Sequence, residues 1–239
     1  MSRLLKMKHK LRQNIKLIFC RPMVELSFNY KKYWEKRRPK RNTKVNSFQK
    51  ERLDWIKERI IAGSTVLDYG CGDGTGLVYL RNETKMNAIG ADICSYAFDY
   101  LKDKNITTIK LNSKKNENLE KIIKNIDYIL LLEVLEHLRN PETLLIKIFN
   151  SVKKGVFFSI PNTGYFTYRI RLLFGSFPVQ WRLHPCEHLR FWTLRDLKWW
   201  LNVLGIFDNS EIKVYEGIPV LNKIFPSLFG MGFIVFVKK

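Results

Sequence analysis

From residue 65 onward, short apolar runs alternate with segments of helical periodicity, and this alternation constrains the fold more than any other feature. Apolar runs predict seven strands, at residues 66–69, 88–91, 106–111, 126–132, 156–160, 212–215 and 233–237. Helical patterns between them cover residues 75–80, 95–101, 118–123, 141–149 and 194–204. Such alternation is typical of α/β proteins with a parallel sheet. We therefore predict a mostly parallel seven-stranded sheet with helices on both faces.

The size and cysteine content favour one reduced domain. The chain has 239 residues, of which 46% are hydrophobic, enough for one sizeable core. Its four cysteines are Cys20, Cys71, Cys94 and Cys186, and no two form a Cys-x-x-Cys pair. We expect neither a disulfide framework nor a metal site. We see no secretory signal and no apolar run near the roughly 20 residues of a membrane span, so we expect a cytoplasmic protein.

Positive charge is concentrated at the N-terminal end. The net charge is +20, and residues 1–50 hold 16 basic and two acidic residues, or +14. We predict a basic arm and linker over residues 1–46, helical over residues 1–20, and one domain over residues 47–239. Two interpretations of the arm stay open. It contacts an acidic partner, such as a phosphate-bearing acceptor, nucleic acid or the anionic inner membrane surface, or it is a solvated tail.

A glycine-rich loop follows the first predicted strand and precedes a helix. Gly70, Gly72 and Gly74 allow sharp turns and close approach of a ligand to the backbone. Their Gly-x-Gly-x-Gly spacing differs from the Gly-x-Gly-x-x-Gly fingerprint of dinucleotide-binding proteins. Asp68 ends the strand, where its negative charge disfavours a pyrophosphate and suits a cationic sulfonium ligand. The loop therefore argues against a dehydrogenase.

A second acidic residue ends the next strand. Asp92 lies 24 residues after Asp68 and can accept hydrogen bonds from both hydroxyls of a ribose. Helix capping or turn formation is the structural alternative for both aspartates. The combination with the glycine loop favours a nucleoside-containing cofactor.

The segment Val-Leu-Asp-Tyr-Gly-Cys-Gly-Asp-Gly at residues 66–74 resembles motif I of class I S-adenosylmethionine-dependent methyltransferases. The resemblance implies a Rossmann-like sheet whose last strand is antiparallel, with S-adenosylmethionine as cofactor. It implies that Asp68 and the loop hold the methionine moiety and that Asp92 holds the ribose. The predicted cofactor-binding residues are Asp68, Gly70, Cys71, Gly72, Gly74, Asp92, Ile93, Asn112 and Glu133.

Later segments narrow the resemblance. Glu-Val-Leu-Glu-His at residues 133–137 resembles the matching stretch of small-molecule O-methyltransferases such as the ubiquinone-biosynthesis enzymes. Residues 159–162, 169–174 and 187–197 are similar to the MetW-like branch. This implies methyl transfer, most simply to oxygen, on a small, glycan-linked or lipid-linked acceptor. The branch does not fix one substrate.

The chain departs from the family after the third strand. The family usually places an acidic residue there to bond the adenine amino group, and this chain has Leu111, Asn112 and Ser113. Asn112 still offers an amide oxygen as an acceptor, and Ser113 is the alternative.

Histidines are the candidate catalytic bases. Transfer from a sulfonium is an in-line displacement, which needs positioning and, for a hydroxyl acceptor, a base of near-neutral pKa. His137 follows the fourth strand, whereas His184 and His188 lie in a segment after the fifth. Each has a structural alternative as a hydrogen-bonded histidine. Glu133 and Glu136 are competing bases, or they orient His137 or the cofactor.

Aromatic residues mark two further segments. Residues 163–192 interleave aromatic side chains with arginines, which predicts either a cap that binds an anionic, partly apolar acceptor or a lid packed on its own domain. Trp34 belongs either to a segment that folds over the cofactor or to a simple packing anchor.

Two other function classes stay open. The basic arm suits a nucleic-acid methyltransferase. However, residues 132–135 lack the Asp/Asn-Pro-Pro-aromatic signature of amine-methylating DNA enzymes. Cytosine-C5 enzymes carry a Pro-Cys nucleophile after strand four, whereas Pro185-Cys186 of this chain stands after strand five. A cofactor-binding but non-catalytic partner of an acyltransferase, as in part of the MetW-like branch, is the other alternative.

Overall fold

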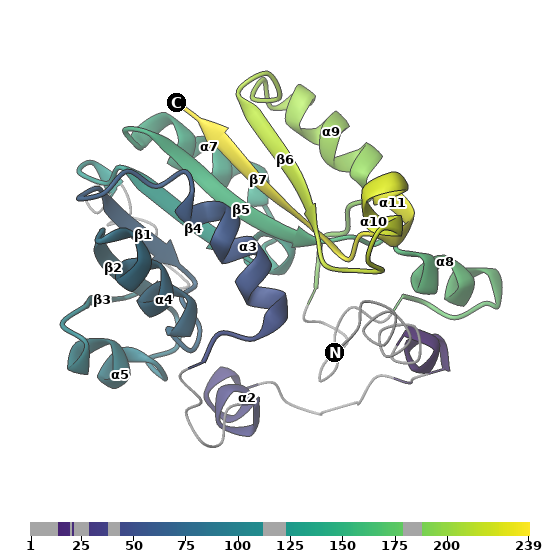
Figure 1. Cartoon of the computed structure of the whole chain (residues 1–239), viewed down its shortest axis with the longest axis horizontal. Coiled ribbons are helices and arrows are strands. Elements are labelled where there is room, and N and C mark those ends of the chain that lie inside the picture. Colours follow the sequence, from purple (N-terminus) through teal and green to yellow (C-terminus); the bar gives the residue numbers. More distant parts are fainter. Residues whose placement is uncertain (1–13, 20, 22–28, 38–43, 112–122, 179–187) are drawn as a thin grey trace.

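A computed structural model describes residues 14–19, 21, 29–37, 44–111, 123–178 and 188–239. Its centre is one seven-stranded sheet with the order β3-β2-β1-β4-β5-β7-β6 (Figure 1). The strands are β1 (Thr65–Tyr69), β2 (Asn87–Asp92), β3 (Thr107–Lys110), β4 (Tyr128–Leu132), β5 (Gly155–Pro161), β6 (Ser210–Tyr215) and β7 (Gly232–Lys238).

The pairing confirms the predicted sheet. Strands β1 to β5 pair in parallel, and β7 is antiparallel to both β5 and β6. The strand order reverses beside β1, because β2 lies on one side of it and β4 on the other. In open sheets of this kind, ligands bind beyond the carboxyl ends of the strands at that point. The ends of β1, β2 and β4 are therefore where a cofactor is expected.

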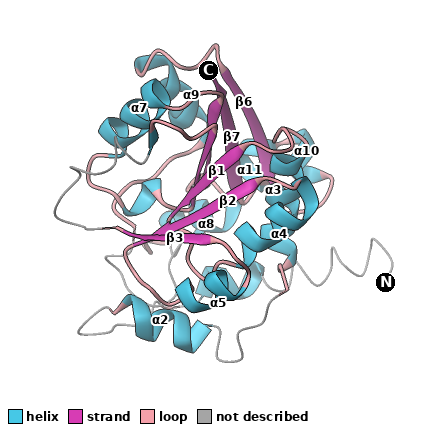
Figure 2. Ribbon diagram, turned by 90° about the vertical axis from the view of Figure 1, so that its left-hand side faces the viewer, coloured by secondary structure: helices cyan, strands magenta, loops and turns pink. Residues whose placement is uncertain are grey.

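Helices cover both faces of the sheet (Figure 2). On one face lie α3 (Ser47–Lys57), α4 (Thr75–Thr84) and α5 (Phe98–Asp103), and on the other α7 (Pro141–Ser151) and α9 (Leu194–Val203). The predicted helices at 75–80, 141–149 and 194–204 therefore form with slightly different ends. The helix predicted at residues 118–123 lies almost entirely outside the described residues.

Five short elements were not predicted from the sequence. They are α2 (Tyr30–Arg37), the 3₁₀ turn η1 (Leu135–His137), α8 (Phe166–Leu173), α10 (Leu221–Ile224) and α11 (Pro226–Phe229). Each is at most eight residues long. Helices this short are marginal in isolation and form through tertiary contacts, so their periodicity is weak in the sequence.

The core has two layers, one on each side of the sheet. Because side chains alternate along a strand, Leu67 and Phe158 pack toward α7 and α9, whereas Val66 and Phe157 pack toward α3 and α4. All four side chains are fully buried. Strands buried on both faces read as continuous apolar runs, which is why the sequence located them well.

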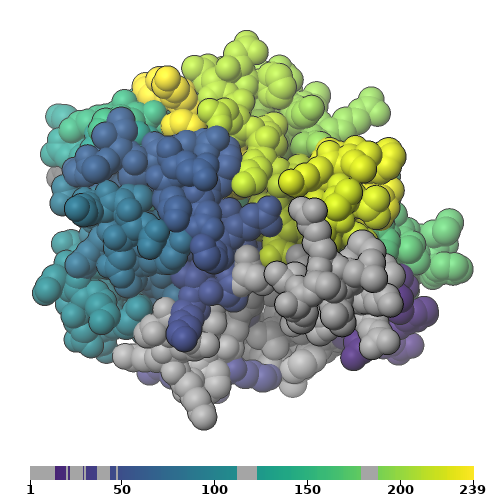
Figure 3. All heavy atoms as spheres, in the orientation of Figure 1, coloured from purple at the N-terminus to yellow at the C-terminus, as the bar shows by residue number. Residues whose placement is uncertain are grey.

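The described end of the N-terminal arm packs against α8. Residues 14–19 are helical. Tyr165 donates a 3.0 Å hydrogen bond to the side chain of Asn14, and Arg171 donates to the backbone carbonyls of Leu17 and Ile18 at 3.1 and 2.7 Å. In Figure 3 these residues (purple) lie beside α8 (green). Within the described part of the chain, no helix combines the length and apolarity needed to cross a bilayer.

Candidate active site

The loop between β1 and α4 has a backbone that favours glycine. Gly70, Gly72 and Gly74 have φ angles of +87°, +58° and +75°, all in the left-handed region. A Cβ on Gly70 would lie 2.6 Å from Cγ2 of Val134, so a side chain there has no room. The Gly70 amide also donates a 2.7 Å hydrogen bond to the carbonyl of Ala91 at the end of β2. The loop is thus fixed between the ends of β1, β2 and β4.

Asp92 holds the loop through its side chain. Its carboxylate accepts hydrogen bonds from the backbone amides of Gly72 at 2.8 Å and Cys94 at 2.7 Å. Burial raises the pKa of Asp92, although these amide hydrogen bonds favour its charged form. Each carboxylate oxygen has a second lone pair, so the geometry leaves acceptor capacity for a ribose hydroxyl.

Asp68 is a buried carboxyl group beside the same loop. It is 5% exposed, and burial together with the neighbouring charge of Asp92 raises its pKa to about 7, against the opposing effect of Arg52. A cationic ligand would stabilise the ionised form of this group. Asp68 therefore suits recognition of a sulfonium or ammonium group at neutral pH.

An aromatic pair lies against the loop. A Cβ on Gly72 would lie 2.7 Å from the ring of Trp34 in α2, and Tyr96 stacks on that ring at 6.4 Å with an interplanar angle of 19°. The structure thus places the Trp34 ring against the glycine loop, and both interpretations of this residue, a cover over the cofactor and a simple packing anchor, stay predictions. Ile93, next to Asp92, is 41% exposed on the same edge.

Glu133 follows β4 and belongs to a polar network that the sequence did not reveal. One carboxylate oxygen accepts hydrogen bonds from Tyr215 at 2.7 Å and Ser159 at 2.9 Å and lies 3.1 Å from the Arg52 guanidinium. The backbone φ of Glu133 is +57°, which is strained for a residue with a side chain. The four residues come from α3, β4, β5 and β6, and no sequence pattern connects them.

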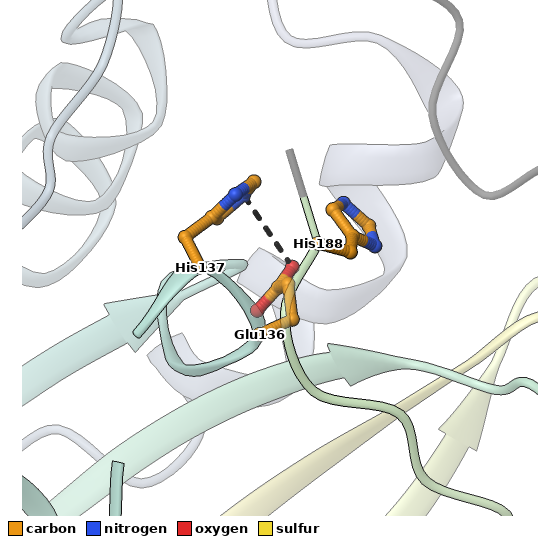
Figure 4. Close-up of side chains that lie close together, drawn as sticks. All are labelled: Glu136, His137 and His188. Carbon is orange, nitrogen blue, oxygen red and sulfur yellow. Dashed lines mark ion pairs between the residues drawn. The ribbon is translucent and has the colours of Figure 1, made fainter. Parts of the chain in front are cut away.

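Two of the predicted bases meet beyond β4. The rings of His137 and His188 lie edge to face with centroids 4.8 Å apart. The carboxylate of Glu136 lies between them, 3.9 Å from Nε2 of His137 (Figure 4). One donor atom from each of the three residues lies within 4.8 Å of the others, so the group could hold a metal ion. Burial and the neighbouring His137 lower the pKa of His188 to about 3, so His188 is neutral at physiological pH.

The backbone explains how residues 51 positions apart in the chain are joined. The carbonyl oxygen of Glu136 accepts hydrogen bonds from the amides of Leu189 at 2.7 Å and Arg190 at 3.1 Å. The Arg190 side chain also pairs with Glu142 on α7, which accepts a 3.0 Å hydrogen bond from Trp200. The segment that carries His188 is therefore fixed to η1.

The aromatic segment after β5 divides into two parts. Tyr165, Tyr168 and Trp192 are buried and belong to the domain's own packing, as the lid interpretation expects. Phe174 and Phe177 are exposed by 77% and 57%. Two predicted site residues, His184 and Asn112, lie outside the described residues. Cys71 is buried beside the loop, and burial raises the pKa of its thiol.

Comparisons with known proteins agree with this geometry. A family model described as "Methyltransferase domain" matches residues 33–206. A ubiquinone biosynthesis O-methyltransferase of Pseudomonas fluorescens is 31% identical over 117 residues, which are 46% of this chain and 50% of that protein. The chain thus matches about half the length of this curated relative.

Solved structures share the fold. A SAM-dependent methyltransferase from Archaeoglobus fulgidus aligns with a TM-score of 0.60 and 22% identity over 89% of this chain and all of that chain. Phosphoethanolamine N-methyltransferase 2 of Haemonchus contortus, solved with S-adenosyl-L-methionine, has a TM-score of 0.57 and 13% identity over 89% of this chain and 60% of that chain. The predictions of fold, methyltransferase activity and cofactor agree with these matches. The chain belongs to the methyltransferase-domain family and has the fold of S-adenosylmethionine-dependent methyltransferases.

Proposed function

We propose that this chain transfers the methyl group of S-adenosylmethionine to a hydroxyl group on a small, glycan-linked or lipid-linked acceptor. The observation that carries this proposal is the pairing of His137 and His188 beyond β4. Val134, which contacts Gly70 of the cofactor loop, lies only three residues before His137. This short separation supports a position of the imidazoles close to the sulfonium.

This arrangement fits an oxygen acceptor. A hydroxyl group is a poor nucleophile until its proton leaves, so its methylation needs an activating group near the reacting oxygen. Amines that are already neutral need only positioning. Two histidines and a buried carboxylate, placed together at the cofactor edge, supply such an activating group.

The bonds change in one displacement. The acceptor oxygen loses its proton, attacks the methyl carbon in line with the sulfur, and the carbon–sulfur bond breaks. The sulfonium becomes the neutral thioether of S-adenosylhomocysteine. Asp68 and Asp92 hold the methionine and ribose parts of the cofactor, and the glycine loop keeps the sulfonium at the reacting distance.

The curated relatives support oxygen as the acceptor atom, since they are named ubiquinone biosynthesis O-methyltransferases. The likeness of residues 187–197 to the MetW-like branch is part of the same proposal and extends the acceptors to surface glycans.

The test is methyl transfer from isotope-labelled S-adenosylmethionine to a panel of acceptors. The panel contains a catechol, a free sugar, a polyprenyl-linked sugar, a primary amine and a short RNA. We expect labelled product only with hydroxyl acceptors, with NMR showing an O-methyl group. An N-methyl or nucleic-acid product contradicts the proposal. Tight cofactor binding with no turnover of any acceptor, together with co-purification of an acyltransferase, supports the non-catalytic partner instead.

A further inference from the structure

We propose that Glu136, His137 and His188 form a binding site for one divalent transition-metal ion of the zinc type, and that this ion binds the acceptor hydroxyl group. The sequence did not predict a metal, because its candidate ligands stand at residues 136–137 and 188, without the close spacing of familiar metal motifs. The metal site stands on geometry alone. Its role in catalysis rests on the function proposed above.

The donor set has the composition of a catalytic metal site. Two imidazole nitrogens and one carboxylate oxygen are a known ligand set for catalytic zinc, which keeps its fourth position open for water or substrate. Imidazole nitrogen also suits iron and other first-row metals, whereas magnesium prefers oxygen ligands alone. The three residues therefore favour zinc, manganese, iron or cobalt over magnesium.

The distances are close to those of a bound site. The three donor atoms lie within 4.8 Å of one another, and the nearest printed pair, Glu136 Oε1 and His137 Nε2, is 3.9 Å apart. Ligands 2.0–2.2 Å from one zinc ion lie roughly 3–3.5 Å from each other. Closing the remaining gap takes rotation of side chains that already converge in Figure 4.

Burial and charge favour a cation at this point. Glu136 is fully buried, and a metal ion beside its carboxylate would offset part of the cost of burying that charge.

The surrounding structure holds the ligands in place. The Glu136 carbonyl accepts hydrogen bonds from Leu189 and Arg190, which fixes the backbone next to His188 against η1. Arg190 is anchored in turn by its ion pair with Glu142. Such supporting contacts around metal ligands keep them oriented before the ion arrives.

The ion would activate the acceptor directly. A hydroxyl oxygen in the open position shares electron density with the ion, so its pKa falls and its proton passes to water. The oxygen, still bound to the ion, then attacks the methyl carbon, and S-adenosylhomocysteine leaves as a neutral thioether. The ion keeps its oxidation state, so no oxidant or reductant takes part.

The test measures metal binding by the full chain without any acceptor. Protein treated with a chelator and then dialysed is titrated with Zn²⁺ and Mn²⁺ by calorimetry, and bound metal is counted by elemental analysis. Co²⁺ provides a visible absorption spectrum that reports its ligands. We expect one ion per chain, bound at least tenfold more weakly by His188→Ala, His137→Ala and Glu136→Gln. Glu211→Gln, an exposed carboxylate paired with Arg59, is the matched control and should bind as the unmodified chain does.

The outcomes separate this proposal from the proposed function. Binding of S-adenosylhomocysteine shows which variants are folded. If Glu136→Gln does not fold, because that residue is buried, the two histidine variants test the metal site. Stoichiometric metal that all three substitutions leave unchanged overturns the site, as does a chain that binds no ion. Hydroxyl methylation by metal-free protein overturns the ion's role in catalysis and leaves the proposed function. Metal binding without methylation of any hydroxyl group overturns the proposed function and leaves the metal site.

Discussion

The hydroxyl of Tyr215 donates a 2.7 Å hydrogen bond to the carboxylate of Glu133, 82 positions earlier in the chain. Tyr215 ends β6 at the edge of the sheet, and Glu133 follows β4 at its centre. Ser159 on β5 and Arg52 on α3 complete the group around the same carboxylate oxygen. The network therefore connects the far edge of the sheet to the strand end that faces the predicted cofactor.

Tyr215→Phe should destabilise the chain by about 1–3 kcal/mol, because it removes one hydrogen-bond donor from the partly buried carboxylate of Glu133. Denaturant unfolding followed by circular dichroism measures the change. Tyr100→Phe on α5 is the matched control and should have a smaller effect. An equal loss in both variants would show that the Glu133 network adds little stability.

Gly72→Ala should weaken cofactor binding and lower stability. The new Cβ would meet the Trp34 ring at 2.7 Å on a backbone with a φ of +58°. Gly63→Ala is the matched control, since its φ is +76° and nothing lies within 4 Å of the added Cβ. The control carries only the backbone strain of about 1 kcal/mol. Calorimetric titration with S-adenosylhomocysteine should show a larger loss for Gly72→Ala, and adding Trp34→Ala should recover part of it.

Affinity for S-adenosylmethionine should rise with pH up to about 7 and then level off. Burial and the charge of Asp92 raise the pKa of Asp68 to about 7, so below that pH a cationic ligand must first drive off a proton. The limiting slope is about tenfold per pH unit. Calorimetry in buffers of different ionisation enthalpy should detect proton release near pH 6. Asp68→Asn should bind weakly with a flat profile, and an unchanged slope in that variant would contradict the assignment.

Without ligand, the stability of the protein should change with pH in the opposite direction. The ordinary pKa of 3.8 is raised to about 7 in the folded state, so the folded protein keeps a proton that the unfolded chain loses as pH rises from about 4 to 7. The stabilisation is complete below pH 4 and is lost through that window, up to about 4 kcal/mol. Urea midpoints at pH 5 and 7.5 should differ less in Asp68→Asn than in the unmodified chain.

Asp92→Ala should weaken cofactor binding by about 1.5–3 kcal/mol, the worth of hydrogen bonds to a charged group. The change also removes the side-chain acceptor of the Gly72 and Cys94 amides, so the loop loses this tie to β2 and keeps the backbone hydrogen bond from Gly70 to Ala91. Asp92→Asn keeps one acceptor oxygen, so its cofactor affinity should lie between those of Asp92→Ala and the unmodified chain. Asp99→Ala, on the exposed side of α5, serves as the control. Binding of NAD in place of S-adenosylmethionine would refute the cofactor assignment.

The basic arm should act through charge. Deletion of residues 1–13 removes five basic residues and spares Asn14, Leu17 and Ile18, whose contacts with α8 are part of the fold. Near an anionic membrane each lysine or arginine contributes roughly 1 kcal/mol. We expect the deletion to reduce flotation with phosphatidylglycerol vesicles, to spare cofactor affinity, and to be mimicked by 1 M salt. Equal flotation of both forms at low salt would identify a solvated tail.

The sequence alone determined the sheet, its layers and the cofactor loop, because these features depend on neighbours in the chain. Strands buried on both faces are continuous apolar runs, and the positive φ angles after β1 require the glycines that stand at residues 70, 72 and 74. Asp68 and Asp92 were found because each ends a recognisable strand.

Only the tertiary structure decided which distant side chains meet. Arg52, Glu133, Ser159 and Tyr215 come from four elements, and their contact depends on strand order, which short-range patterns do not contain. The same holds for His188, which joins Glu136 and His137 through backbone hydrogen bonds to the Glu136 carbonyl. Histidines 51 positions apart carry no signal of being neighbours, because their contact is produced by the packing of the whole sheet and its helices.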